Sequence, residues 1–112
     1  MKKELLRFKP NQVENHDVRH IYEDGKVVII YPKKFGKIEK WIRNKIGGPK
    51  EMRRPLDKFT TFIWEKCDGE NNIAQIISEF DKQFGEEVAP ADQRVQKFIK
   101  QLLELNLITL DS

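Results

Sequence analysis

The sequence predicts an α+β domain in which a three-stranded antiparallel sheet is followed by three helices. Runs rich in β-branched and aromatic residues come first, within residues 18–31. Apolar residues with helical spacing then dominate from residue 56 to the end. Strands followed by short helices, in this order, are typical of winged-helix-like α+β domains. The chain has 112 residues, which suits one domain with a modest core.

The first fifteen residues are expected to be a flexible lead-in. Residues 1–15 are polar, contain Pro10 and show no clear hydrophobic period. We therefore expect the folded domain to span residues 16–112.

A β-hairpin is predicted next. Its strands are Val18–Tyr22 and Lys26–Tyr31, and Asp24-Gly25 between them matches a tight turn that needs positive φ. Pro32 is expected to end the second strand, because proline has no N–H to donate to the ladder.

Residues 33–50 form a basic insertion. Apolar residues in it recur at helical spacing and predict a short amphipathic helix, which Gly47-Gly48-Pro49 would end. Three roles stay open for this helix: packing back on the core, docking a partner, or lying on an anionic membrane surface. Its candidate docking residues are Lys37, Lys40, Trp41, Arg43 and Lys45.

Residues 51–54 are predicted to form the third strand. Pro55 would fit best at its end and on an exposed edge of the sheet. An exposed edge presents unpaired backbone N–H and C=O groups to other chains.

Three helices should follow. The first begins at Asp57, a good N-cap, and Asp68-Gly69 ends it. The second is capped by Asn71 or Asn72 and closed by Gly85. Apolar side chains on the inward faces of these two helices are Phe59, Phe62, Ile63, Cys67, Ile73, Ile76, Ile77, Phe80 and Phe84.

The third helix should start near Pro90, which suits a first-turn position. Asn106 would end it, and Leu107–Leu110 would add a short final strand. Its inward residues are Val95, Phe98, Ile99, Leu102 and Leu103.

The charge distribution argues against a DNA-binding role for the helices. Residues 1–55 carry fifteen Lys/Arg and seven Asp/Glu, a net charge of +8, whereas residues 56–112 carry six and eleven, a net charge of −5. A helix that enters a DNA groove needs positive charge around it, because phosphate contacts dominate affinity. The loop before the third helix instead carries Glu86, Glu87 and Asp92. A winged-helix transcription regulator stays open only as an alternative function. In it, the basic insertion would contact the DNA backbone without sequence specificity.

No catalytic, metal or cofactor chemistry is predicted. His16 and His20 are four apart, but they lie at the entry to a strand, where this spacing does not place them together. Cys67 falls on the buried face of a helix, so an inert core thiol is expected. No apolar stretch approaches the roughly 20 residues of a membrane span. With a single cysteine and no signal-peptide pattern, we expect a cytoplasmic protein. Because no catalytic pattern is found, we also expect it to be non-enzymatic.

The stretch LDKFTTFIWEKCDGENNIAQI, residues 56–76, resembles the PqqD family. The resemblance continues in FGEEV and in RVQKFIKQLLELNLITL. Two departures are Thr60-Thr61, where glycine is common in the family, and Asn106 in place of a frequent glycine. The basic insertion is also longer than in compact members.

The resemblance implies a peptide-binding adaptor. PqqD-like domains hold the leader portion of a ribosomally made precursor peptide for a modifying enzyme, often a radical-SAM protein. The leader adds as a strand to the edge of the third strand, against the third helix. Carried over to this chain, the contacting residues are Glu51, Met52, Arg53, Arg54, Arg94, Lys97, Phe98 and Gln101.

The basic side chains among these residues would favour a leader with Asp or Glu. An exposed edge also permits a homodimer. A structural subunit of a larger complex stays open as a further alternative.

Overall fold

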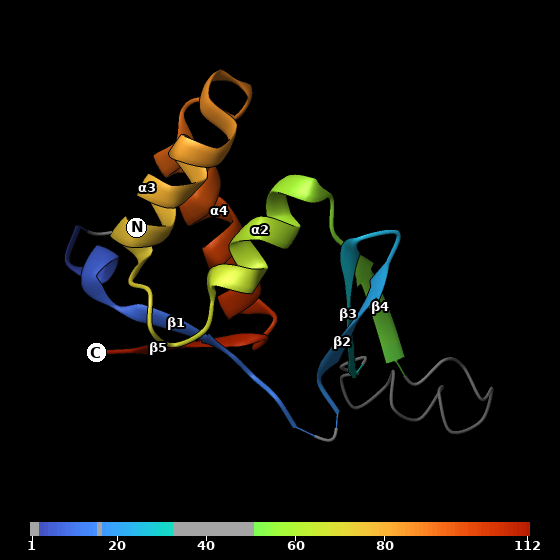
Figure 1. Cartoon of the computed structure of the whole chain (residues 1–112). Coiled ribbons are helices and arrows are strands. Elements are labelled where there is room, and N and C mark those ends of the chain that lie inside the picture. Colours follow the sequence, from blue (N-terminus) through green and yellow to red (C-terminus); the bar gives the residue numbers. More distant parts are fainter. Residues whose placement is uncertain (1–2, 16, 33–50) are drawn as a thin grey trace, which may run out of the picture. The chain divides into compact units, whose positions relative to one another are not determined.

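The computed structural model describes residues 3–15, 17–32 and 51–112 (Figure 1). The predicted amphipathic helix of the basic insertion lies outside the described residues. So do its candidate docking residues Lys37, Lys40, Trp41, Arg43 and Lys45. That prediction therefore stays a prediction.

The chain divides into two compact units. Residues 14–56 form the first, which we call the sheet unit. Residues 1–13 and 57–112 form the second, which we call the helical unit. The described N-terminal residues, 3–13, thus belong to the same unit as the C-terminal helices.

The sheet unit contains three antiparallel strands. β2 (Arg19–Glu23) pairs with β3 (Lys26–Pro32), and β3 pairs with β4 (Glu51–Pro55). The turn residues Asp24 and Gly25 have φ values of 53° and 76°, as a two-residue hairpin with right-handed twist requires. The predicted hairpin and third strand are confirmed.

The central strand β3 carries the apolar core of this sheet. Val27, Val28, Ile29 and Ile30 are consecutive and at most 5% exposed. Because side chains alternate between the faces of a strand, four buried residues in a row mean that both faces of β3 are covered. The strands beside it are mostly exposed, which is typical of edge strands.

In the helical unit, α2 (Lys58–Lys66) begins at the predicted cap. The Asp57 carboxylate accepts a hydrogen bond from the Thr60 N–H, and the Thr60 hydroxyl accepts one from the Asp57 N–H. This reciprocal capping box satisfies two backbone donors at the helix start. The helix ends at Cys67, which is fully buried.

α3 (Ile73–Phe84) follows with a second capping box, between Asn72 and Gln75. Of the two caps that the sequence left open, the structure selects Asn72. Gly85 closes the helix with a φ of 56°. Four phenylalanines of α2 and α3 pack ring against ring; they are Phe59, Phe62, Phe80 and Phe84.

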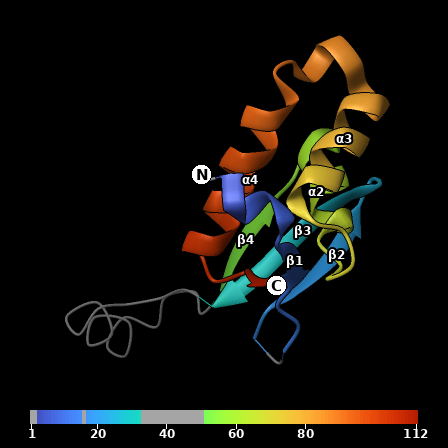
Figure 2. The ribbon, with the colours of Figure 1, turned by 90° about the vertical axis from the view of Figure 1, so that its left-hand side faces the viewer.

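α4 (Ala91–Glu104) lies beside α3 after the short 3-10 turn η2 (Gly85–Val88) (Figures 1 and 2). Pro90 occupies the N-cap position of α4, one residue before the first turn where the sequence placed it. Asn106, with a φ of 58°, turns the chain into β5 (Ile108–Asp111). The predicted order of three helices and a final strand is confirmed.

The lead-in is where the structure departs from the sequence-based expectation. It contains a 3-10 turn, η1 (Lys3–Arg7), and a strand, β1 (Lys9–Gln12), that pairs antiparallel with β5. The chain before residue 13 is therefore a regular part of the helical unit and not an irregular arm. The strand forms because it pairs with β5, far along the chain. A polar segment held by such pairing shows no hydrophobic period, so the sequence did not predict the strand.

β1 is held on both sides. The Val13 N–H donates to the Leu107 carbonyl next to β5, whereas the Gln12 N–H donates to the Cys67 carbonyl on the other side. The Gln12 side chain adds a 2.8 Å hydrogen bond to the Trp64 carbonyl. β1 thus ties the end of α2 to the end of α4.

The core of the helical unit is mostly the predicted one. Fully or nearly fully buried side chains, between 0 and 5% exposed, are Ile63, Trp64, Cys67, Ile73, Ile76, Phe80, Val88, Val95, Phe98, Ile99, Leu102, Leu107 and Ile108. Phe59, Phe62, Ile77, Phe84 and Leu103 are only half-buried. No helix in the part of the chain that the structure describes is long and apolar enough to span a bilayer.

Candidate functional site

β4 is an edge strand whose outer backbone groups can be assigned. The Leu56 N–H donates a 2.8 Å hydrogen bond to the Val27 carbonyl. In an antiparallel ladder, bonded and non-bonded pairs alternate, so Arg54 and Met52 also turn their backbone groups toward β3. Glu51 and Arg53 therefore turn their N–H and C=O groups outward. Among the described residues, β3 is the only strand beside β4.

The side chains of Glu51 and Arg53 are engaged in ion pairs with β2. Glu51 accepts hydrogen bonds of 2.6 and 3.2 Å from both terminal nitrogens of Arg19. The Arg53 guanidinium donates a 2.6 Å hydrogen bond to Glu23. All four side chains lie on one face of the sheet, on either side of the buried residues of β3.

These pairs change the expected charge of the edge. The hydrogen bond from Arg19 lowers the pKa of Glu51 below its ordinary value, and the same contact raises the pKa of Arg19. Because Arg53 already faces Glu23, its charge is balanced within the sheet. The prediction that Arg53 offers an unbalanced cation to an acidic partner is therefore weakened.

The opposite face of β4 carries Met52 and Arg54. Met52 is 39% exposed, which is high for a large apolar side chain, whereas Arg54 is half-buried. The edge thus has one face with paired charges and one face on which an exposed thioether lies beside a half-buried arginine.

The other predicted site residues form a stripe on α4. Arg94, Lys97, Phe98 and Gln101 are three or four residues apart, so they share one side of the helix. Arg94 and Lys97 are exposed, and Gln101 is half-buried. Phe98 is only 5% exposed and offers an edge of its ring more than an open apolar face.

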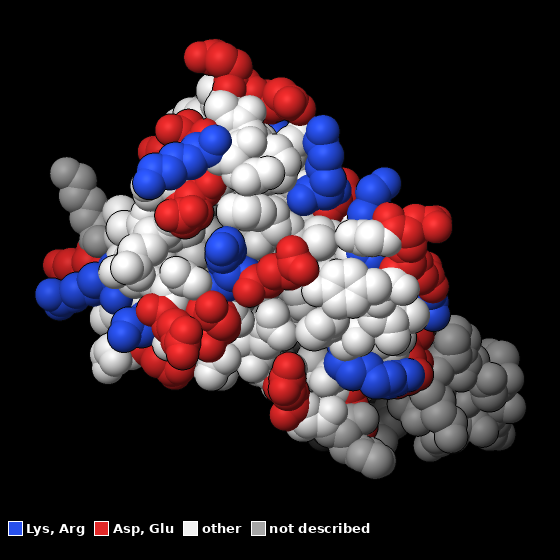
Figure 3. Space-filling view, in the orientation of Figure 1, with Lys and Arg blue, Asp and Glu red and all other residues white. Residues whose placement is uncertain are grey.

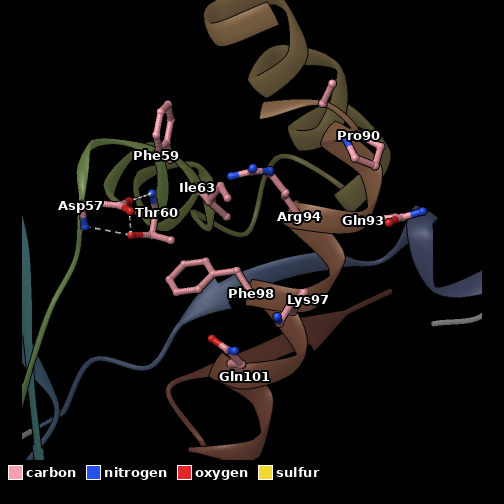
Figure 4. A pocket seen from close by; sticks show the side chains of 11 residues that line it. Asp57, Phe59, Thr60, Ile63, Pro90, Gln93, Arg94, Lys97, Phe98 and Gln101 are labelled. Atoms are coloured by element: carbon pink, nitrogen blue, oxygen red, sulfur yellow. Dashed lines mark hydrogen bonds between the residues drawn. The ribbon is translucent and has the colours of Figure 1, made fainter. Parts of the chain in front are cut away.

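This stripe borders a hollow of about 480 Å³ between α4 and the start of α2 (Figure 4). We call it the α2–α4 hollow. Its α2 side consists of Asp57, Phe59, Thr60 and Ile63. Its α4 side consists of Ala89, Pro90, Gln93, Arg94, Lys97, Phe98 and Gln101.

Side chains of both signs reach this hollow. In Figure 4, Arg94 and Phe98 extend from α4 toward α2, while Gln93 points away. Burial raises the pKa of Asp57, but hydrogen bonds from the Thr60 N–H and hydroxyl outweigh it, so the pKa of this carboxyl lies below its ordinary value. Asp57 is therefore ionised at neutral pH, and with Arg94 and Lys97 the hollow holds one excess positive charge.

The hollow can hold an apolar side chain whose polar neighbours carry negative charge. Phe59 is half-buried and supplies apolar surface, whereas Ile63 and Phe98 are only 1 and 5% exposed and add little to it. Arg94 and Lys97 supply donors at its border. The sequence identified Asp57 only as a helix cap and did not identify Phe59 or Thr60 as site residues. No local sequence pattern could have identified them, because the hollow forms only where residues about 30 positions apart meet.

The eight predicted contact residues thus fall into two sets. Glu51, Met52, Arg53 and Arg54 lie on β4 of the sheet unit. Arg94, Lys97, Phe98 and Gln101 lie on α4 of the helical unit.

The metal-ligand and thiol candidates can be examined among the described residues. No group of three or more His, Cys, Asp or Glu side chains that could hold a metal occurs in them. Burial raises the pKa of the Cys67 thiol to about 12, so the nucleophilic thiolate is scarce at neutral pH.

The face drawn in Figure 3 carries Lys/Arg and Asp/Glu side chains interspersed rather than gathered by sign. A phosphate-binding surface needs a basic patch or stripe. The drawn face of the described residues does not provide one.

The fold and these two surfaces define a small α+β protein that offers a strand edge and a helix face. The family model described as "Coenzyme PQQ synthesis protein D (PqqD)" matches residues 54–108. Over these residues the chain belongs to the PqqD family. The match includes the α4 stripe and Arg54, and it begins just after Glu51, Met52 and Arg53. Searches of curated proteins and of solved structures found no match to this chain.

Proposed function

We propose that this protein is a non-catalytic adaptor that binds the leader portion of a ribosomally made precursor peptide and presents it to a modifying enzyme. One observation carries the proposal: in a chain of the PqqD family, the strand at the start of the matched segment has one edge with no neighbouring strand among the described residues. The outward backbone groups of Glu51 and Arg53 are suited to pair with an extended peptide.

Backbone pairing along β4 would supply affinity that depends little on the leader's sequence. An added strand bonds to N–H and C=O groups, which every residue but proline offers. Pro55 at the end of β4 lacks the donor and would limit how far the pairing extends.

Selectivity would come from the α4 stripe. Arg94 and Lys97 are exposed and have no ion pair with an acidic side chain among the described residues, whereas Arg53 has Glu23. A leader with Asp or Glu would therefore be read mainly by Arg94 and Lys97. An adjacent apolar side chain would enter the α2–α4 hollow against Phe59, which is half-buried.

The partner enzyme follows from the family alone. PqqD-like proteins commonly serve a peptide-modifying enzyme, often of the radical-SAM type, and nothing in the described residues selects one type. The basic insertion, with Trp41 and its lysines, is the candidate surface for such an enzyme.

The test is a titration of the isotope-labelled chain with precursor peptides encoded beside its gene, or with peptides selected from a random display library. We expect backbone amide shifts at Glu51 and Arg53 and along α4. Replacing both Arg94 and Lys97 with Glu should weaken binding by about tenfold or more, since each lost charge pair contributes about 1 kcal/mol. The matched control for each single variant, Arg94→Glu or Lys97→Glu, is Lys82→Glu, because Lys82 is an exposed lysine on α3 and its replacement changes the net charge by the same amount.

Binding without any shift at Glu51 and Arg53 would contradict strand addition. Equal loss of affinity in Lys82→Glu would show that only net charge matters. Tight, steeply salt-dependent binding to random duplex DNA, with no peptide bound, would favour the winged-helix regulator instead.

A further inference from the structure

The edge of β4 has a charge pattern that is complementary to itself. Its two outward residues are Glu51 and Arg53, an acid and a base separated by one residue. When two copies of such an edge run antiparallel, outward residues must face outward residues, because only these have unpaired backbone groups.

This requirement leaves three symmetric registers in which Glu51 and Arg53 face themselves or each other, and charge distinguishes them. Registers centred on Arg54 or Pro55 use Pro55 as an outward position and lose hydrogen bonds, because proline has no N–H. A register centred on Arg53 places the two Arg53 side chains opposite each other, and one centred on Glu51 does the same for the carboxylates. Like charges directly opposite are destabilising in antiparallel pairs. The register centred on Met52 instead places Glu51 of each copy opposite Arg53 of the other.

We infer that a second copy of this chain pairs with the β4 edge in the register centred on Met52, giving a symmetric dimer. The Glu51 and Arg53 positions then exchange backbone hydrogen bonds across the two-fold axis. On the other face, the two exposed Met52 side chains meet at a non-hydrogen-bonded position, where side chains of opposing strands come closest.

The ion pairs within each chain do not block this arrangement. Arg53 contacts Glu23 through one terminal nitrogen. A guanidinium has five N–H donors, so the remaining donors are available to the Glu51 carboxylate of the second copy. The exposed ion pairs contribute little affinity and mainly select the register.

The dimer would also regulate the peptide site. If the proposed function holds, a leader peptide and the second copy use the same outward groups, so each excludes the other. A leader able to displace the second copy would convert a dimer into a peptide-bound monomer.

The test is disulfide trapping of Met52→Cys in the full chain. Opposing Cα atoms of a non-hydrogen-bonded pair lie about 4.5 Å apart, within the range that a disulfide spans. We expect air-oxidised Met52→Cys to form a covalent dimer. The matched control is Ile21→Cys, because Ile21 is 37% exposed and Met52 is 39% exposed. Equal trapping of both variants would overturn the inference.

A charge exchange tests the register. In the Met52→Cys background, Glu51→Arg places Arg opposite Arg, and Arg53→Glu places Glu opposite Glu, so each variant alone should trap less dimer. A mixture of the two should restore trapping, because both opposing pairs become oppositely charged. Equal trapping alone and in the mixture would overturn the register. The same mixture carrying Ile21→Cys should trap little, which excludes simple attraction between oppositely charged proteins.

Peptide binding is measured separately from trapping. If Met52→Cys traps no more than Ile21→Cys while leader peptides still shift the Glu51 and Arg53 amides, the self-pairing is wrong and the proposed function stands. If Met52→Cys is trapped as a dimer but no leader peptide binds, the self-pairing stands and the proposed function is wrong.

Discussion

The Arg53 guanidinium lies 2.6 Å from the Glu23 carboxylate, although β3 separates their strands. The contact crosses the sheet on the same face as the Arg19–Glu51 pair. Both pairs join the candidate edge strand to the far edge of the sheet. The charges of Glu51 and Arg53 are therefore each balanced by a partner on β2. Arg53 thus contributes less to the basic character of the predicted edge than the sequence alone indicates.

The first prediction concerns the strength of this contact. Both side chains are 54% exposed, and solvent screens such pairs strongly. A double-mutant cycle with Glu23→Gln and Arg53→Gln should give a coupling free energy of about 0.2–1 kcal/mol in urea unfolding. A coupling above about 2 kcal/mol would show that the pair is a structural anchor of β4 instead of a surface contact.

The second prediction concerns the capping box of α2. Replacing Asp57 with Ala should lower the free energy of unfolding by about 0.5–2 kcal/mol at neutral pH, because the Thr60 N–H loses its acceptor. The ordinary pKa of this carboxyl is 3.8, and its pKa in the folded chain is lower. A lowered pKa stabilises the fold above the ordinary value, and this stabilisation is lost as pH falls through the folded value.

In urea unfolding, the difference between wild type and Asp57→Ala should therefore be fully present above the ordinary pKa of 3.8 and should shrink as the pH falls below it, through the lowered pKa of the folded chain. Asp57→Asn is the control, because asparagine keeps a capping oxygen without the titrating carboxyl. A pH-independent difference between wild type and Asp57→Ala would contradict the role of the ionised carboxylate.

Features set by neighbouring residues were predictable, and features set by distant residues were not. Asp57, Gly85 and the Asp24-Gly25 turn act within a few residues of themselves, so their chemistry is visible in the sequence. The pairing of Arg53 with Glu23 depends on two strands meeting across a third, 30 residues apart. The α2–α4 hollow likewise exists only once the helices have packed.

β1 shows the same limit in the fold. Its sequence, KPNQ, contains none of the β-branched or aromatic residues that favour strands. Hydrogen bonds from both sides hold it in an extended conformation, and their partners near Cys67 and Leu107 lie far along the chain. Tertiary context has overridden a weak local preference.

The third prediction concerns the only cysteine. Cys67 is fully buried, and burial raises the pKa of its thiol to about 12. At about pH 8 the thiolate fraction is then about one in 10⁴, so a thiol reagent should label the native chain far more slowly than the unfolded chain. Rapid labelling of native wild type, followed by mass spectrometry, would contradict this burial. Slow labelling of Cys67 also means that the thiol introduced by Met52→Cys is the one that reports in the trapping experiment.

The fourth prediction tests whether β1 is docked, through two glycines with nearly equal backbone conformations. Gly25 and Gly69 have φ values of 76° and 80°, so an alanine at either position costs about 1–2 kcal/mol in backbone strain. Their surroundings differ. A Cβ at Gly25 would meet nothing within 4 Å, whereas a Cβ at Gly69 would lie 3.0 Å from the Asn11 side chain on β1.

Gly69→Ala should therefore lower the free energy of unfolding by more than Gly25→Ala, and the excess should arise from contact with β1. Asn11→Gly removes the side chain that the new Cβ would contact. Adding it to Gly69→Ala should therefore restore the additional loss of unfolding free energy, but not the loss that comes from backbone strain. Urea unfolding of Gly25→Ala, Gly69→Ala, Asn11→Gly and the double variant Asn11→Gly/Gly69→Ala measures the backbone strain and the contact with β1 separately. Equal losses in Gly69→Ala and Gly25→Ala, unaffected by Asn11→Gly, would mean that β1 does not lie against the Asp68-Gly69 turn in solution.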